Sequence, residues 1–205
     1  MLQKENKISS DFQLRGRVVF FATNNVHKFN EVRVVLARYG IAVGMLRAKG
    51  VEIQSDDLGE IAKASALNAC ARCGLPVIVE DAGLFVDALK GFPGPYAAYA
   101  YQTLGNAGLL KLMENVSDRS AKFKSAIVYC DDSSHEPVLF QGEVKGVITV
   151  GERKPDGLSS FGFDPVFQPD GEEKTFAEMS IEEKNRFSHR AVATRLFAEW
   201  YGNLR

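Results

Sequence analysis

The chain has few cysteines and no long apolar segment, and both shortages narrow the class of protein. Its 205 residues include only three cysteines, Cys70, Cys73 and Cys130. An odd, low count is typical of a reducing compartment rather than of a disulfide-stabilised secreted domain. No apolar run approaches the ~20 residues of a membrane-spanning helix, and the N-terminal residues lack the apolar core of a signal peptide. We therefore expect a cytoplasmic protein that does not interact with membranes.

Net charge and the common catalytic motifs are also missing. The 25 basic and 26 acidic side chains leave a formal net charge of -1, so no overall field attracts a nucleic-acid polymer. The sequence contains no P-loop, no G-x-G-x-x-G, no G-x-S-x-G and no H-E-x-x-H pattern. Cys70 and Cys73 form C-x-x-C inside a predicted helix and without a second pair, which favours a structural role. A small anion held by a few local cations remains compatible with these absences.

A short apolar strand that ends in two adjacent acids is the most unusual stretch that is present. Residues 77–79 are apolar and β-branched, which is typical of a buried strand, and Glu80 and Asp81 follow directly. Burying a carboxylate without a partner costs several kcal/mol. The pair therefore indicates a metal ion or a general base, unless the strand simply ends in water. A second apolar run follows Gly83, and this spacing predicts a bend or a tight hairpin there.

A strand-to-helix turn near the N-terminus is a second candidate site. Apolar residues 18–22 predict a strand, and the periodicity of residues 28–39 predicts a helix. The start of a helix offers unpaired N–H groups and a partial positive charge, which suit a phosphate group. The connecting residues add three short polar side chains and the cation of Lys28. The same residues would also suit an ordinary helix cap with a solvated lysine.

Two further stretches are candidate ligand-binding sites, one rich in aromatic and one rich in cationic side chains. Residues 161–164 place two aromatic rings around a glycine and before an acid, which suits a flat ligand ring as well as it suits a core aromatic cluster. Near the C-terminus, Lys184, His189 and Arg190 lie at predicted helix starts. Cations there favour polyanion binding, although a basic solvated turn would look the same.

The remaining pattern predicts an α/β fold. Residues 58–73 predict an Ala-rich helix, and residues 121–129 and 137–150 predict two long strands joined by a turn. This antiparallel hairpin excludes an all-parallel arrangement, so we expect a long mixed β-sheet flanked by helices. We expect a single domain over residues 17–205, preceded by a polar and disordered extension over residues 1–16.

Five motifs occur in the order and spacing of one known family. They are T-N-N-V-H-K at 23–28, E-D-A-G-L at 80–84, G-F-P-G at 91–94, F-G-F-D-P at 161–165, and E-K-N with S-H-R within 183–190. Together they resemble the Ham1-like inosine triphosphate pyrophosphatases, which act on non-canonical purine nucleoside triphosphates. The resemblance runs from about Arg17 to the C-terminal helix.

The resemblance implies a reaction, a cofactor and a set of site residues. It implies hydrolysis of ITP, dITP or XTP to the monophosphate and pyrophosphate with Mg²⁺, in a homodimer whose substrate cleft lies between two lobes of one domain. Asp81 would be the catalytic, metal-linked acid, Glu52 the other magnesium-binding acid, and Glu80 a further candidate ligand. Phe161 would stack on the purine, and Arg190 would read a 6-oxo group. The implied substrate-binding residues are Thr23, Asn24, Asn25, Val26, His27, Lys28, Ala82, Phe161, Gly162, Phe163, Asp164, Lys184, His189 and Arg190.

Two departures from the family pattern keep alternatives open. Ala82 stands where the family usually has Ser or Thr, and Ser65 stands near a position that often carries lysine. One alternative is a pyrophosphatase of the related Maf type with a different base specificity. The other is a nucleotide-binding module without activity, although three acids near a triphosphate argue against it. The Phe161 loop and residues 188–190 favour the Ham1-like assignment.

Overall fold

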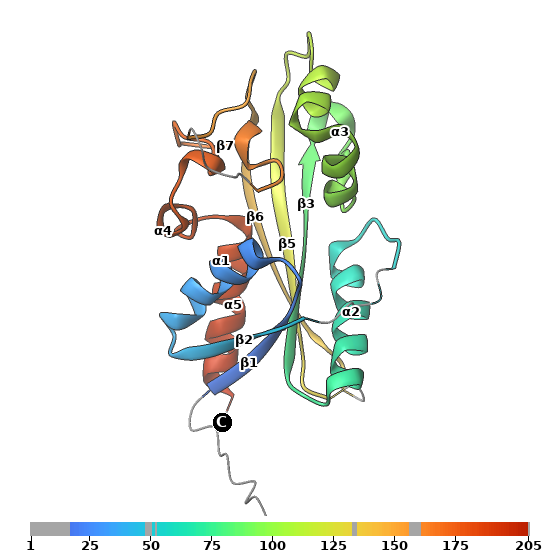
Figure 1. Cartoon of the computed structure of the whole chain (residues 1–205), viewed down its shortest axis with the longest axis vertical. Helices are drawn as coiled ribbons and strands as arrows, with labels where there is room; N and C mark the ends of the chain where they lie inside the picture. Colours follow the sequence, from blue (N-terminus) through green and yellow to red (C-terminus); the bar gives the residue numbers. More distant parts are fainter. Residues whose placement is uncertain (1–16, 48–50, 52, 133–134, 156–160, 205) are drawn as a thin grey trace, which may run out of the picture.

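A mixed β-sheet runs through the whole molecule (Figure 1). The computed structural model describes residues 17–47, 51, 53–132, 135–155 and 161–204. Within them the sheet has seven strands in the order β2-β1-β3-β5-β6-β7, and β4 pairs with β3. Strands β2, β1 and β3 are parallel to one another, and all other pairings are antiparallel. The strands are β1 (Arg17–Ala22), β2 (Ile41–Leu46), β3 (Val77–Val86), β4 (Pro93–Gly94), β5 (Ser120–Cys130), β6 (Val138–Ile148) and β7 (Phe167–Pro169).

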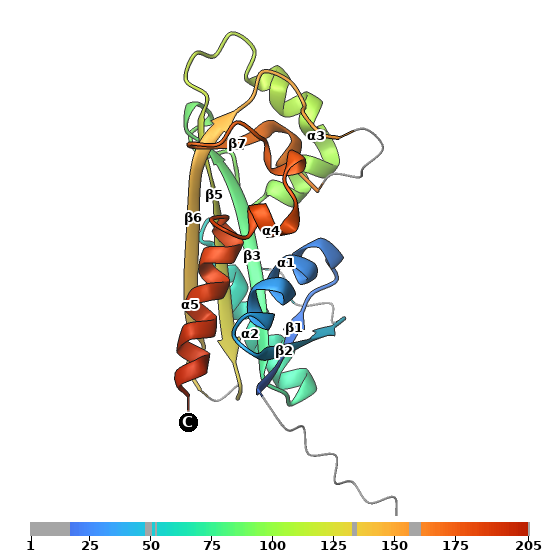
Figure 2. The same cartoon turned by 90° about the vertical axis from the view of Figure 1, so that its left-hand side faces the viewer.

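Helices cover both faces of one end of the sheet. Helices α1 (Val26–Ala37) and α5 (His189–Asn203) pack with β1 and β3 in one apolar cluster. Helix α2 (Leu58–Cys73) packs on the opposite face against β3 and β5. Figures 1 and 2 show α2 on the far side of the sheet from α5. This arrangement confirms the predicted α/β class with a mixed sheet.

Short elements build the second lobe at the other end of β3, β5 and β6. They surround a third apolar cluster to which β3, β5 and β6 all contribute. The elements are α3 (Ala97–Leu112), α4 (Ile181–Lys184) and the 3₁₀ turns η1 (Asp87–Leu89), η2 (Asp164–Val166) and η3 (Phe176–Glu178). Gly105 breaks the helical backbone of α3. Because the same long strands serve both lobes, the lobes share one sheet.

The prediction of a bend or hairpin at Gly83 is wrong. Strand β3 is a single strand of ten residues and pairs with β5 along its whole length. The glycine serves a different purpose, because a Cβ atom at position 83 would lie 2.4 Å from the carbonyl oxygen of Gly94 in β4. The glycine at this position therefore permits the close approach of β4 rather than a reversal of the chain.

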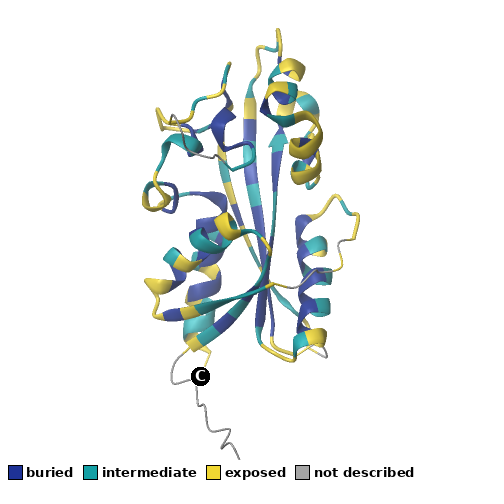
Figure 3. Cartoon of the chain, in the orientation of Figure 1, coloured by how far each residue is buried: buried dark blue, intermediate teal, exposed yellow. Residues whose placement is uncertain are grey.

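Local sequence signals set the ends of the helices. The side chain of Asn25 accepts a hydrogen bond from the N–H of Lys28 and caps α1, so the helix begins two residues earlier than its predicted start. Gly74 ends α2 in a left-handed conformation, as expected of a helix stop. Burial is greatest in the central strands β3 and β5, whereas the outer faces of the helices are exposed (Figure 3). Within the described residues, no helix is long and apolar enough to cross a membrane.

Candidate active site

The turn between β1 and α1 presents Lys28 to the middle of β3. The hydroxyl of Thr23 accepts a hydrogen bond from the N–H of Asn25, which fixes the turn. The Lys28 ammonium lies 2.8 Å from Oε2 of Glu80, and the lysine side chain keeps partial contact with solvent. Asn24, Val26 and His27 of the same turn are exposed. The turn thus joins a helix N-terminus and a cation, which is the combination that binds phosphate.

Glu80 is an interior charge with partners on both carboxylate oxygens. Oε1 accepts hydrogen bonds from the Ser125 hydroxyl at 2.7 Å and from Nε of Arg190 at 3.0 Å. Burial alone would raise the pKa of Glu80, but Arg190 and Lys28 lower the pKa to about 2. The side chain is therefore ionised and fully engaged by cations, which leaves it poorly suited to hold a metal ion.

Glu31 completes the arrangement, and the sequence analysis did not identify it. Its carboxylate pairs with Nη1 of Arg190 through Oε2, and with the Lys184 ammonium at 2.9 Å through Oε1. Burial alone would raise the pKa of Glu31, but Lys184 and Arg190 lower it. The available signal was its spacing, because Glu31 falls one helical turn from both Lys28 and the buried Val35.

The first residue of η2, Asp164, also joins this network. Its carboxylate lies 2.6 Å from the Lys184 ammonium, and burial raises the pKa of Asp164 while Lys184 opposes that rise. Burial alone would lower the pKa of Lys184, but the charges of Asp164 and Glu31 raise that pKa above its ordinary value. Lys184 is thus a buried cation between two acids, and the alternative of a basic solvated turn is wrong.

The two aromatic residues just before Asp164 lie in different environments. The ring of Phe161 stacks on the ring of His27, with centroids 5.4 Å apart. Phe163 is buried in the second lobe, where its ring meets Tyr101 edge to face. Gly162 between them has a positive φ of 54°, which lets the chain turn. Of the two rings, that of Phe161 is therefore the one that is partly exposed and lies beside the turn between β1 and α1.

His189 is an interior imidazole rather than a surface cation. It is 2% exposed and stacks on the ring of Phe123, with centroids 4.8 Å apart. Burial, together with the neighbouring cations of Arg190 and Lys184, lowers the pKa of His189 well below its ordinary value. The ring is therefore neutral at physiological pH.

Asp81 lies on the other face of β3. Successive side chains of a strand point to opposite faces, so Asp81 projects away from the network that binds Glu80. It is half-buried, as is the neighbouring Ala82. Glu52 lies outside the described residues, and within them no cluster of three or more His, Cys, Asp or Glu could hold a metal ion. The described part of the chain thus offers Asp81 as a half-buried carboxylate on the face of β3 opposite to Glu80.

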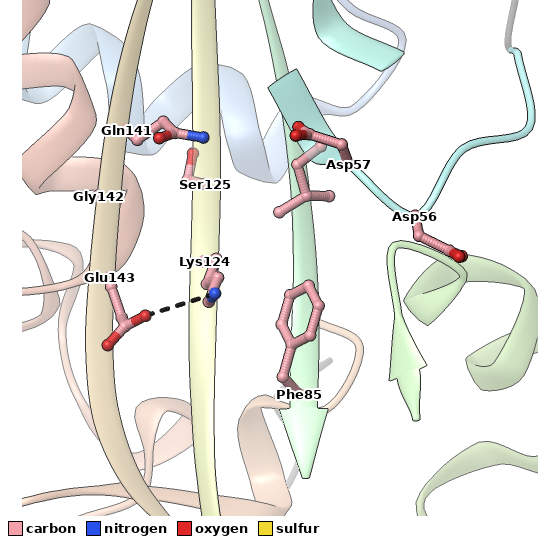
Figure 4. A pocket seen from close by; sticks show the side chains of 9 residues that line it. Asp56, Asp57, Phe85, Lys124, Ser125, Gln141, Gly142 and Glu143 are labelled. Carbon is pink, nitrogen blue, oxygen red and sulfur yellow. Dashed lines mark ion pairs between the residues drawn. The ribbon is translucent and has the colours of Figure 1, made fainter. Parts of the chain in front are cut away.

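A groove of about 340 Å³ opens on the face of the sheet that carries α2 (Figure 4). Lys124 spans part of it, 5.0 Å from the centroid of the Phe85 ring and 3.7 Å from a carboxylate oxygen of Glu143. None of the predicted site residues lines this groove. Its lining residues are Asp56, Asp57, Leu58, Phe85, Lys124, Ser125, Gln141, Gly142 and Glu143.

Comparison with known proteins shows the family to which this chain belongs. The sequence model of the Ham1 family matches residues 19–200. This chain belongs to the Ham1 family. It is 49% identical over 185 residues to a protein of Methanopyrus kandleri named dITP/XTP pyrophosphatase, covering 90% of this chain and 96% of that one. A protein of Ignicoccus hospitalis with the same name is 51% identical over 181 residues, covering 87% of this chain and 93% of that one.

Solved Ham1 structures share the fold. The Ham1 protein of Staphylococcus aureus superposes with a TM-score of 0.74 at 30% identity, covering 90% of this chain and 97% of that one. A HAM1 protein of Coxiella burnetii gives a TM-score of 0.79 at 26% identity, covering 92% and 100%. In this Ham1 chain the structure gathers Lys28, Glu80, Asp164, Lys184 and Arg190 into one network, together with the unpredicted Glu31.

Proposed function

We propose that this chain hydrolyses non-canonical purine nucleoside triphosphates, such as dITP and XTP, to the monophosphate and pyrophosphate. The observation that carries the proposal is the meeting of distant motifs at one place. Ion pairs join four segments: the turn between β1 and α1, which we call the phosphate turn, strand β3 with Glu80, the segment 161–164, which we call the Phe161 loop, and the start of α5. The names of relatives that are nearly half identical over nine-tenths of the chain support the same substrate class.

The chain's own residues would act on the triphosphate in distinct ways. Lys28 and the N-terminus of α1 would neutralise phosphate oxygens and stabilise the departing pyrophosphate. Asp81 would orient and deprotonate the water that attacks the α-phosphorus. No covalent intermediate is required, because water itself is the nucleophile.

We include Mg²⁺ in the proposal as the cofactor. Asp81 and Glu52 would hold the ion, and phosphate oxygens and waters would complete its coordination, which is how proteins commonly bind Mg²⁺ with only one or two carboxylates. When bound, the ion neutralises phosphate charge and polarises the reacting phosphorus. Glu80 is not part of this set, because cations and a hydroxyl occupy both of its oxygens.

Base selection would use the Phe161 ring and the donors of Arg190. The purine would stack on Phe161, whose partly exposed ring lies against His27. Arg190 would donate to a 6-oxo group, whereas the 6-amino group of adenine would bring two donors face to face. This pairing favours hypoxanthine and xanthine over adenine.

A product assay tests the proposed reaction. The protein is mixed with Mg²⁺ and, separately, with dITP, XTP, ATP and GTP, and the released phosphates are separated. We expect pyrophosphate from dITP and XTP, little product from ATP or GTP, and loss of turnover when EDTA removes the metal. Orthophosphate as first product would contradict attack at the α-phosphorus. Absence of any product would favour a nucleotide-binding module.

We further propose that the chain is a cytoplasmic homodimer. Support for a dimer comes from several exposed apolar side chains on α3 and in the residues just before it. Tyr99 is 70% exposed there, and large apolar side chains left exposed suit a protein interface. The other members of the group are Phe92, Tyr96, Tyr101 and Leu104.

A further inference from the structure

Six charged side chains form one unbranched chain of alternating sign through the interior. Lys28 pairs with Glu80 at 2.8 Å, and Glu80 pairs with Arg190 at 3.0 Å. Arg190 pairs with Glu31, Glu31 with Lys184 at 2.9 Å, and Lys184 with Asp164 at 2.6 Å. The chain begins at the phosphate turn of one lobe and ends at the Phe161 loop of the other. We call these six residues the charge chain.

Within the charge chain, Glu80 links the cation proposed to bind phosphate, Lys28, to the cation proposed to bind the base, Arg190. One oxygen faces the phosphate-side cation Lys28, and the other faces the base-side cation Arg190. Its side chain is fully buried, whereas Lys28 is 18% exposed and can meet a ligand. A rotation of this carboxylate would therefore change its contacts with Lys28 and with Arg190 at the same time.

The hydroxyl of Ser125 opposes such a rotation. It donates at 2.7 Å to the oxygen that also accepts from Arg190, and the residue is 1% exposed. Ser125 pairs in the sheet with Ala82 on one side and Gly142 on the other. A Cβ atom at position 142 would lie 2.1 Å from the carbonyl oxygen of His189, so the first turn of α5 rests on the sheet at this register. The backbone itself thus brings Arg190 to Glu80 beside Ser125.

We propose that Ser125 and Glu80 are positioning residues that couple phosphate binding at Lys28 to base binding at Arg190. The proposal rests on the proposed function and deepens it, since it assigns the buried acid of the E-D pair to positioning rather than to metal binding. Ser125 touches no substrate and acts through Glu80. The coupling requires that one substitution at Ser125 weaken both ends of the site together.

Separate ligands for the two ends test the coupling directly. Binding of pyrophosphate and of dIMP, each with Mg²⁺, is measured by calorimetry for the wild type, Ser125→Ala and Thr103→Ala. Thr103 is the matched control, because its hydroxyl donates to the carbonyl oxygens of Tyr99 and Ala100 within α3. We expect Ser125→Ala to weaken both ligands by about tenfold, the usual effect of a hydrogen bond to a charged group, and Thr103→Ala to weaken neither. A loss at one end alone, or at neither end, overturns the proposal.

A double-substitution cycle shows that Ser125 acts through Glu80. In the Glu80→Gln background, Ser125→Ala should cause less than about a twofold further loss of dIMP binding, since the oriented carboxylate is already gone. Full additivity of the two losses would overturn the proposal. Melting temperatures of all variants identify unfolding, and Ser125→Ala alone keeps the test usable if Glu80→Gln does not fold. Because both ligands are products, a wild type that binds them but turns over no dITP would refute the proposed function without touching the coupling.

Discussion

At the scale of single residues, two adjacent acids have separate environments and separate uses. Glu80 and Asp81 are neighbours in β3, so their side chains leave opposite faces of the sheet. Glu80 is held by Lys28, Arg190 and Ser125, and its pKa of about 2 keeps it charged. Asp81 is half-buried on the other face. The pair seen in the sequence thus divides into a positioning acid and a candidate catalytic acid.

Replacing Asp81 tests that division. We expect Asp81→Asn to lower kcat for dITP by at least about 100-fold, because the amide cannot take a proton from water. Binding of dITP, measured by calorimetry, should remain within a few-fold of the wild type. Asp87→Asn is the control, since Asp87 is exposed at the start of η1 and has no assigned role. Near-normal turnover in Asp81→Asn would remove this residue from the mechanism.

The buried imidazole of His189 predicts a dependence of stability on pH. Its pKa falls on folding, so below the unfolded value of 6.5 the unfolded state binds more protons than the folded state. Stability is therefore complete above that pH and declines as the pH drops below it, by at most about 1.4 kcal/mol per pH unit. Urea unfolding between pH 7 and pH 5 should show this slope.

Two substitutions separate His189 from other groups in that experiment. In His189→Gln the slope between pH 6.5 and pH 5 should flatten, because the titrating group is gone. In His135→Gln it should persist, because His135 is an exposed residue of the turn before β6. A slope that survives in His189→Gln would assign the effect to another group.

At the scale of elements, local patterns predicted most helices and strands, whereas contacts distant in sequence decided the rest. Caps and periodicity predicted α1, α2 and the β5–β6 hairpin. The spacing around Gly83 suggested a reversal because a glycine between apolar runs is ambiguous, and only β4 shows why the residue is needed. Glu31 was missed because its partners Lys184 and Arg190 lie more than 150 residues away. The motifs supplied candidate site residues, but they did not indicate how the charged side chains among them pair.

The contact between α5 and β6 at Gly142 predicts a sensitive position. A Cβ atom there would meet the carbonyl oxygen of His189 and the N–H of Ala193, so the start of α5 must shift. We expect Gly142→Ala to cost about 1–3 kcal/mol of unfolding free energy and to weaken dITP binding. Gly151→Ala is the control, because nothing in the described part of the chain lies within 4 Å of its Cβ position. Equal stability of the two variants in urea would contradict this packing.

At the scale of the whole molecule, the two lobes are joined by a shared sheet and by the charge chain. Apolar clusters stabilise each end separately, whereas the ion pairs cross between them. Removing one member of a buried pair leaves an uncompensated charge, at a typical cost of about 3–5 kcal/mol. The interior of the site is therefore stable only when its charges are balanced, which favours a preorganised site over one assembled by the substrate.

The exposed apolar group on α3 predicts how the chain assembles. Light scattering after gel filtration should give the mass of a dimer for the wild type, and Tyr99→Glu should shift it towards the monomer. Val150→Glu is the matched control, because Val150 is an exposed apolar residue outside the α3 group. A wild type that stays monomeric at all concentrations would contradict the proposed homodimer.

The position of bond cleavage tests the central claim most directly. Turnover of dITP is run with Mg²⁺ in water enriched in ¹⁸O, and the products are examined by mass spectrometry. Attack of water on the α-phosphorus predicts one labelled oxygen in the monophosphate and none in pyrophosphate. Label in pyrophosphate, or release of labelled orthophosphate, would contradict the account.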